Sequence, residues 1–197
     1  MIEDSTEKQL IVVGGPNGSG KTTLALEIVA EKEVTYISAD DIAYELDPEK
    51  PEKVRIRAGK EFFRRLESAI QDEENILIES TLSGKTLVPI LKRCKSKHNY
   101  SIVIVFIFVS NVDFCAERVA TRVQKGGHNV PLEDIKRRFH RSLKNFWNIY
   151  RHDSDLWYLY YNAEDDFQEV ARHLQNDLYV LDESLFVTFK QIVKEDE

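Results

Sequence analysis

Apolar residues recur along this chain in two alternating patterns, short β-branched runs and longer amphipathic stretches. The short runs predict strands, and the stretches with apolar residues at near-helical spacing predict helices. We expect strands at 10–13, 34–38, 75–79, 101–109 and 156–161, and helices at 21–32, 53–72, 86–96, 111–124 and 131–150. Beyond Asn162 the pattern predicts another helix, a short strand at 178–181 and a final helix. Strands that alternate with helices favour a three-layer α/β fold around a mainly parallel sheet.

Length and composition favour one domain over residues 1–197. The hydrophobic share is 42%, enough for a sizeable core. We expect a flexible, acidic N-terminus over residues 1–9 and an α/β extension over 164–197. The first nine residues lack the basic and apolar regions of a signal peptide, and the apolar run at 102–109 is far shorter than the ~20 residues of a membrane helix. The expectation is a cytoplasmic protein with no membrane contact.

The net charge and the two cysteines argue against further classes of protein. The formal net charge of −7 argues against a nucleic-acid binder, because such proteins need a positive surface to neutralise phosphates. Cys94 and Cys115 form no C-x-x-C pair and show no zinc spacing with histidines. Both are therefore interpreted as buried or idle thiols of a reducing compartment.

The segment between the first predicted strand and helix matches the phosphate-binding pattern G-x-x-x-x-G-K-[ST] at every position. It consists of Gly15, Pro16, Asn17, Gly18, Ser19, Gly20, Lys21 and Thr22. Glycines let backbone N–H groups surround phosphate oxygens, and the N-terminus of the next helix attracts the same anion. Lys21 is expected to reach the β- and γ-phosphates, Thr22 to hold Mg²⁺ and Thr23 to contact the α-phosphate. The motif predicts a nucleoside triphosphate site, with ATP and Mg²⁺ as the expected ligands.

The residues downstream favour a small-molecule kinase over other P-loop proteins. The chain lacks the Asn-Lys-x-Asp motif of GTPases, and no apolar strand ends in the Asp-Glu of an ABC-type ATPase. The second predicted strand leads to Asp40 and the third to Glu79, Thr81 and Ser83, so these side chains should share a sheet edge with the P-loop. A carboxylate there can accept the proton of an attacking hydroxyl, and a second can grip another hydroxyl or the metal shell. Asp40 could instead cap a helix that begins near residue 42.

A segment at 118–131 is the candidate lid over the transferring phosphoryl group. Arg118 and Arg122 lie four residues apart on one helix face, and two glycines at 126–127 offer a hinge. The role of His128 beside them is left open. The basic run 136–138 is interpreted as a solvated helix face, and the aromatic residues at 139, 146, 147 and 150 as core.

Taken in order, these motifs resemble the zeta toxin family of P-loop kinases, over about residues 10–163. Besides the P-loop, the resemblance depends on seven short segments: 38–40, 58–60, 79–85, 118–123, 126–131, 137–139 and 161–162. It implies phosphoryl transfer from ATP with Mg²⁺ to a sugar hydroxyl of a UDP-N-acetylhexosamine, and an antitoxin protein as partner. It also implies Lys21 as the P-loop lysine, Asp40 as general base and Arg118 as a phosphate contact. Glu79 and Thr81 correspond to substrate-binding residues.

The chain departs from the family at several positions. Well-known toxins carry an arginine just before the proline of the lid, where this chain has an asparagine and a valine before Pro131. Lys60 and Lys85 stand where many relatives have arginine. The glycine-glycine-histidine version resembles the short chromosomal relatives more than the plasmid toxins. Two other functions stay open: a polynucleotide 5′-kinase, and a nucleotide-binding regulator or toxin–antitoxin partner without turnover.

Overall fold

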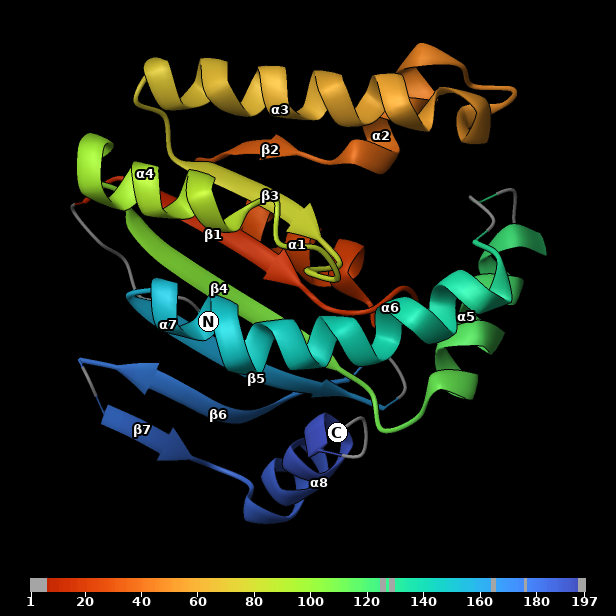
Figure 1. Cartoon of the computed structure of the whole chain (residues 1–197), viewed down its shortest axis with the longest axis vertical. Helices are drawn as coiled ribbons and strands as arrows, with labels where there is room; N and C mark the ends of the chain where they lie inside the picture. The colour runs from red at the N-terminus through yellow and green to blue at the C-terminus, as the bar shows by residue number, and fades with distance from the viewer. Residues whose placement is uncertain (1–6, 125–126, 128–129, 164–165, 176, 195–197) are drawn as a thin grey trace.

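The computed structural model describes residues 7–124, 127, 130–163, 166–175 and 177–194. Its centre is a seven-stranded sheet in the order β2-β3-β1-β4-β5-β6-β7 (Figure 1). The strands are β1 (Gln9–Gly14), β2 (Thr35–Ile37), β3 (Ile76–Ser80), β4 (Ser101–Phe108), β5 (Leu156–Asn162), β6 (Phe167–Leu174) and β7 (Asp177–Val180). Strands β1 to β5 pair in parallel, whereas β6 and β7 are antiparallel additions at one edge.

Helices cover both faces of the sheet (Figure 1). They are α1 (Lys21–Glu31), α2 (Ala39–Leu46), α3 (Arg55–Gln71), α4 (Val88–His98), α5 (Val112–Gln124), α6 (Leu132–Asn145), α7 (Arg151–Asp153) and α8 (Glu183–Lys194). A 3₁₀ turn η1 (Pro51–Val54) precedes α3, and a π-helical turn η2 (Phe146–Tyr150) joins α6 to α7. Buried residues of α1 pack on one face, and those of α3, α4, α6 and α8 pack on the other. The three-layer α/β fold with a mainly parallel sheet is confirmed.

Strand β1 is the middle one of the five parallel strands, and its side chains supply both layers of core. Leu10 and Val12 belong to the larger hydrophobic cluster, and Ile11 and Val13 belong to the smaller cluster beneath α1. All six residues of β1 are buried, and the strand pairs with β3 on one side and β4 on the other. A run of β-branched residues without alternation is what such a position demands. The loop that follows β1 therefore begins at a fixed point in the middle of the sheet edge.

The segment after Asn162 corrects one expectation. A helix was predicted there, but the chain forms the antiparallel strand β6. The register of β6 against β5 shifts between Leu159 and Tyr160, which leaves Val170 as the extra residue of a bulge. Val170 and Ala171 are consecutive and both join the larger cluster. The bulge thus interrupts the two-residue alternation by which a strand is recognised, and it imitates helical spacing.

Other boundaries differ by small amounts. The helix expected at 131–150 is α6 continued by the π-helical turn, and the helix expected at 86–96 begins and ends two residues later. Gln9, placed in a flexible N-terminus, is part of β1, and residues 1–6 lie outside the described part of the chain. The four aromatic residues assigned to the core are buried, as are the free thiols of Cys94 and Cys115. Among the described helices, none is long and apolar enough to span a bilayer.

Candidate active site

The loop from Gly14 to Gly20 connects the buried end of β1 to the first turn of α1. Gly15 and Gly20 have φ of 146° and 93°, in the region that favours glycine. Space is also limiting, since a Cβ on Gly15 would lie 2.3 Å from the carbonyl oxygen of Ile107. The loop ends with the backbone N–H of Leu24 donating to the Gly20 carbonyl at 3.2 Å. The N-terminus of α1 thus faces the loop, the arrangement that binds phosphate in P-loop proteins.

Asn162, at the end of β5, braces this loop from outside. Its side chain is fully buried, and its Nδ2 donates to the carbonyl of Ser19 at 2.9 Å. Its Oδ1 accepts from Arg118, which also donates to the carbonyls of Gly18 and Ala163. The guanidinium of Arg118 lies over the ring of Phe114. Arg118 therefore contacts the P-loop backbone and does not line the pocket beside the loop.

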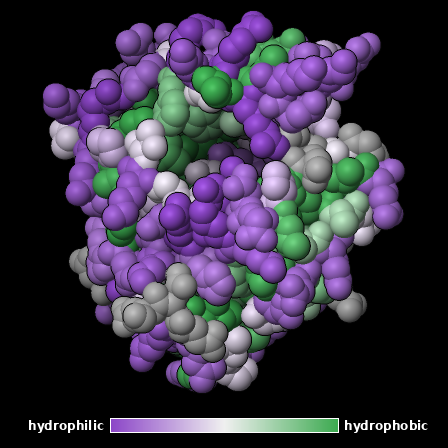
Figure 2. All heavy atoms as spheres, turned by 45° about the vertical axis from the view of Figure 1, so that its right-hand side comes forward, coloured by the Kyte–Doolittle hydropathy of each residue, from purple (hydrophilic) through white to green (hydrophobic). Residues whose placement is uncertain are grey.

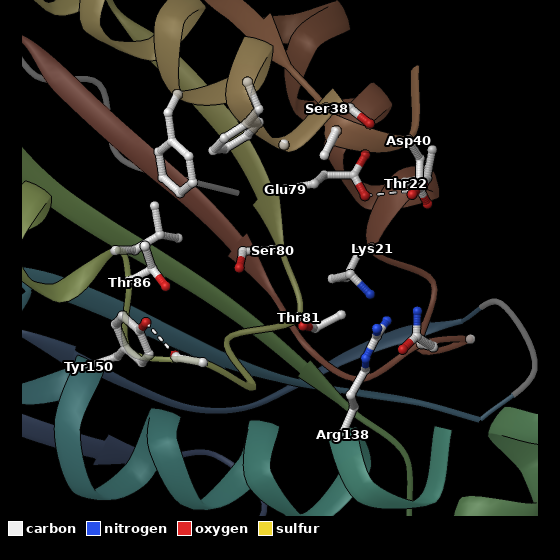
Figure 3. A pocket seen from close by; sticks show the side chains of 18 of the residues that line it. Lys21, Thr22, Ser38, Asp40, Glu79, Ser80, Thr81, Thr86, Arg138 and Tyr150 are labelled. Atoms are coloured by element: carbon white, nitrogen blue, oxygen red, sulfur yellow. Dashed lines mark hydrogen bonds between the residues drawn. The ribbon is translucent and has the colours of Figure 1, made fainter. Parts of the chain in front are cut away.

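A pocket of about 330 Å³ opens beside the P-loop, beyond the ends of β2 and β3 (Figure 3). It is lined by Asn17, Gly18, Lys21, Thr22, Ser38, Ala39, Asp40, Gly59, Phe62, Phe63, Glu79, Ser80, Thr81, Gly84, Thr86, Leu87, Arg122, Arg138 and Tyr150. Polar groups gather at the P-loop end, and the rings of Phe62, Phe63 and Tyr150 contribute apolar surface. Figure 2 shows a largely hydrophilic face of the molecule with an apolar area recessed between polar side chains.

Lys21 lies at the P-loop end of the pocket, where its Nζ donates to the carbonyl of Pro16 at 2.8 Å. Burial lowers the pKa of its ammonium group, and the carboxylates of Glu79 and Asp40 oppose that shift. These two carboxylates are therefore close enough to Lys21 to share its electrostatic environment. A bound polyphosphate would stabilise the charged lysine further, since it adds negative charge at the same place.

Glu79, at the end of β3, connects the P-loop to the neighbouring strand. One of its carboxylate oxygens accepts from the hydroxyl of Thr22 at 3.0 Å, and the other accepts from the hydroxyl of Tyr36 on β2. Burial and the negative charge of Glu79 both raise the pKa of Tyr36, so the tyrosine remains a donor at neutral pH. Sequence reasoning missed Tyr36, because nothing near residue 36 suggests a partner on another strand.

Asp40 lies in the first turn of α2 and lines the pocket. The residue that caps α2 is Ser38, whose hydroxyl accepts from the backbone N–H of Asp41 at 3.3 Å. The alternative in which Asp40 serves as the cap is therefore wrong. Its position in the first turn, close to Lys21 and Thr22 (Figure 3), leaves its carboxylate available to a ligand of the pocket.

The remaining candidates are divided between the pocket and its supports. Thr81 and Arg122 line the pocket, whereas Ser83 contacts it through Thr81, at 2.8 Å between the two hydroxyl oxygens. Arg138 of α6 also lines the pocket, which corrects its assignment to a solvated face. In the lid segment 118–131, residues 125, 126, 128 and 129 lie outside the described residues. The role of His128 is therefore not tested. Residues 118–124 belong to α5.

The pocket offers oxygen ligands that suit a magnesium ion. The hydroxyl of Thr22 and the carboxylate of Glu79 are 3.0 Å apart, and Asp40 lines the same end of the pocket. Mg²⁺ usually takes one or two protein oxygens and completes its shell with water and phosphate. No group of three or more metal-ligating side chains occurs within the described ranges, so a metal held by protein ligands alone is not indicated there. These residues fit a metal shared with a nucleotide.

Comparison with known proteins agrees with the fold. An uncharacterized protein of Haemophilus influenzae is 30% identical over 139 residues, which are 68% of this chain and 94% of the relative. A chain of the AvrRxo1-ORF1:-ORF2 complex with ATP superimposes with a TM-score of 0.72 at 16% identity, over 95% of this chain and 64% of that one. The PezAT chromosomal toxin–antitoxin system of Streptococcus pneumoniae gives 0.59 at 14% identity, over 98% and 88%. At these identities the solved structures establish a shared fold.

The family follows from a sequence match that covers residues 10–143, about two thirds of the chain. The matched segment contains the P-loop, the carboxylates of the pocket and its two arginines, so the match includes the site as well as the sheet. This chain belongs to the AAA_33 family of AAA domains and has the fold of a P-loop kinase.

Proposed function

We propose that this protein is an ATP-dependent kinase that transfers the γ-phosphoryl group to a hydroxyl of a small molecule. The observation that carries the proposal is that one pocket combines the P-loop groups Lys21 and Thr22 with Asp40 and Thr81. A nucleotide whose γ-phosphate lies at Lys21 would leave the rest of the pocket to an acceptor. The pocket is enclosed by described residues on several sides, which favours a small acceptor over water alone.

In the proposed reaction the acceptor oxygen attacks the γ-phosphorus as the bond to the β,γ-bridging oxygen breaks, and ADP leaves. Asp40 takes the proton of the acceptor hydroxyl. Lys21 and Arg122 neutralise charge on the phosphoryl oxygens, and Arg118 supports the nucleotide end through its contacts with the P-loop. Glu79 and Thr81 orient the acceptor, and Ser83 acts through its hydrogen bond with the Thr81 hydroxyl. Such orientation is a large part of phosphoryl-transfer catalysis.

Magnesium belongs to this proposal because the oxygen donors suit it. Thr22 would hold the ion, with Glu79 next to it through the hydrogen bond between the two side chains. When bound, Mg²⁺ neutralises charge on the β- and γ-phosphates. The hydroxyl of Tyr36 keeps the Glu79 carboxylate directed toward Thr22, so the chain itself positions this group before any ligand arrives.

The acceptor we propose is the sugar of a UDP-N-acetylhexosamine, as the resemblance to zeta toxins implies. The far end of the pocket supports a ring-shaped polar acceptor. Thr81 and Thr86 offer hydroxyls, and the rings of Phe62 and Phe63, which pack edge to face with centroids 5.2 Å apart, offer apolar surface. Sugars present apolar ring faces and polar edges, so this combination suits them.

The test is a mass-spectrometric assay with ATP, Mg²⁺ and UDP-N-acetylglucosamine, in which a product heavier by one phosphoryl group is expected. Lys21→Ala should abolish the product. Lys8→Ala is the matched control, because Lys8 pairs with Glu73 at the opposite end of the sheet and its loss should leave the rate unchanged. A product with a 5′-hydroxyl oligonucleotide instead would favour the polynucleotide kinase. ATP binding with no product from any alcohol would refute the kinase.

A protein partner is the second part of the proposal. Two of the similar structures are complexes whose names describe a toxin–antitoxin system or paired reading-frame products. We infer, from the resemblance to zeta toxins, that a second chain can close the nucleotide end of this pocket. Expression of the wild-type chain alone should then arrest growth, whereas Lys21→Ala should not. Equal growth of both strains at equal protein levels would contradict a toxin role without affecting the kinase assay.

A further inference from the structure

Helix α6 and its π-helical turn hold the loop that follows β3. Three side chains donate to carbonyls of this loop: Ser142 to Thr81, Asn145 to Leu82 at 2.9 Å, and Tyr150 to Gly84 at 2.7 Å (Figure 3 for Tyr150). We call Ser142, Asn145 and Tyr150 the carbonyl clamp. Ser142 and Tyr150 are buried. The clamp joins two segments about sixty residues apart in the chain, and the loop that it holds carries Thr81 of the pocket.

The π-helical turn explains how one helix supplies all three donors. In a regular α-helix, residues five apart differ by about 140° around the axis, so Asn145 and Tyr150 would face different directions. In a π-helical turn the backbone hydrogen bonds run from i to i+5, which widens the turn and reduces the angle between residues five apart. The turn at Phe146–Tyr150 therefore rotates Tyr150 toward the side of the helix on which Asn145 lies, and both side chains reach the same loop. Such turns inside helices are frequent at functional sites.

The loop needs external support because its own conformation is unfavourable. Leu82 has a φ of 52°, in the left-handed region that a branched hydrophobic residue rarely adopts. Its buried side chain packs against Gly14, where a Cβ would lie only 2.6 Å from it. Within the loop, the N–H of Leu82 donates to Ser80, and the hydroxyls of Thr81 and Ser83 form a pair at 2.8 Å. A strained loop of this kind persists when its surroundings fix it.

We propose that the carbonyl clamp positions the loop of residues 81–84 for acceptor binding. Ser142, Asn145 and Tyr150 then determine the rate of transfer to the alcohol and leave the affinity for ATP unchanged. This inference rests on the proposed kinase function for its acceptor. The P-loop is braced separately, by Asn162 and Arg118, and none of the clamp residues donates to it. The two ends of the pocket thus have separate hydrogen-bonded supports within the described structure, and they meet where Leu82 packs against Gly14.

The experiment compares Tyr150→Phe with a matched control, Tyr100→Phe. Each tyrosine is buried and donates to a backbone carbonyl, Tyr150 to Gly84 and Tyr100 to Glu74 at 2.8 Å. Burial raises the pKa of both to about 12. Glu74 precedes β3 and Gly84 follows it, so the two variants remove the same kind of bond at opposite ends of one strand.

Three quantities are measured for each variant: hydrogen exchange of a peptide covering residues 80–88, affinity for a fluorescent ATP analogue, and phosphoryl transfer to UDP-N-acetylglucosamine relative to ATP hydrolysis. For Tyr150→Phe we expect exchange about fivefold faster or more, unchanged ATP affinity, and a transfer-to-hydrolysis ratio reduced about fivefold to tenfold, as for one lost buried hydrogen bond. Ser142→Ala should act in the same direction. Tyr100→Phe should leave all three quantities at their wild-type values.

The clamp is refuted if exchange in the 80–88 peptide is unchanged in both Tyr150→Phe and Ser142→Ala, or if Tyr100→Phe accelerates it equally. A loss of ATP affinity that matches the loss of transfer would also overturn it, since the effect would then be general. If even the wild-type chain transfers nothing to UDP-N-acetylglucosamine, the acceptor proposal fails, and the exchange and affinity measurements alone decide the clamp.

Discussion

Replacing Asn162 by alanine tests whether its bond to Ser19 holds the P-loop in the conformation that binds ATP. The substitution removes the donor that satisfies the buried carbonyl of Ser19, together with an acceptor for Arg118. A buried backbone carbonyl left without a partner costs about 1–3 kcal/mol. This penalty applies to the native P-loop conformation, because the loop could relieve it only by turning the carbonyl of Ser19 away from its present position.

The expected change in ATP affinity follows from that penalty. If the loop pays it to keep the phosphate-binding conformation, the dissociation constant for ATP rises by about 5-fold to 150-fold, since each 1.4 kcal/mol is a factor of ten. Global stability should fall by no more than the same 1–3 kcal/mol. The two are measured by titration with a fluorescent ATP analogue and by urea unfolding.

The matched control is Asn75→Ala. Asn75 accepts from the backbone N–H of Gln9 at 2.9 Å, at the start of β1, and is exposed. Water can replace this acceptor, so ATP affinity should stay within about twofold of wild type. Our account of the P-loop is refuted if Asn162→Ala binds ATP as tightly as Asn75→Ala does, because the bond to Ser19 would then contribute nothing to the phosphate-binding conformation.

Three other substitutions test separate parts of the molecule. Asp40→Asn should reduce turnover by about 10²–10⁴ with little change in ATP affinity, the range for a general base, and near-normal turnover would remove that role. Gly20→Ala should lose ATP binding, because φ is 93° and the added Cβ would lie 2.4 Å from Nδ2 of Asn162; tight binding by the folded variant would contradict this. Burial raises the pKa of Cys115 from 9.0 to about 12. Above pH 9 the thiol ionises in the unfolded chain but stays neutral in the folded chain. Ionisation therefore favours unfolding, and the free energy of unfolding should decline as the pH rises from 9 toward 12. Cys115→Ala should therefore flatten the decline of urea stability over this range, and an equal decline in both proteins would contradict the assignment.

Local pattern alone predicted the fold class and the phosphate-binding loop. The β-branched run at 10–13 has no polar alternation, and only a strand buried on both faces tolerates that. The eight residues of the P-loop are contiguous, and their chemistry requires glycines at fixed spacing before a helix. Asp40, Glu79 and Thr81 could be named for a related reason, since the carboxyl ends of parallel strands meet at one edge.

Interactions between distant segments could not be predicted in this way. Tyr36 is directed at Glu79 only because β2 pairs with β3, and Arg138 enters the pocket only because α6 packs beside the loop that follows β3. The spacing of apolar residues predicts which face of a helix is buried, but it does not predict which arginine on the other faces will line a pocket. Strand β6 was mistaken for a helix because its bulge places two consecutive side chains in the core.

The sequence by itself determined what depends on neighbours along the chain: the alternation of strands and helices, the glycines of the P-loop and the polar residues that end each strand. Tertiary structure decided what depends on partners across the fold: the brace of Asn162 on the P-loop, the capture of Glu79 by Tyr36 and the π-helical turn that brings Tyr150 to Gly84. The physical reason is that a hydrogen bond requires two groups to lie next to each other. The sequence gives the identity of each group, but only the fold decides which distant groups become neighbours.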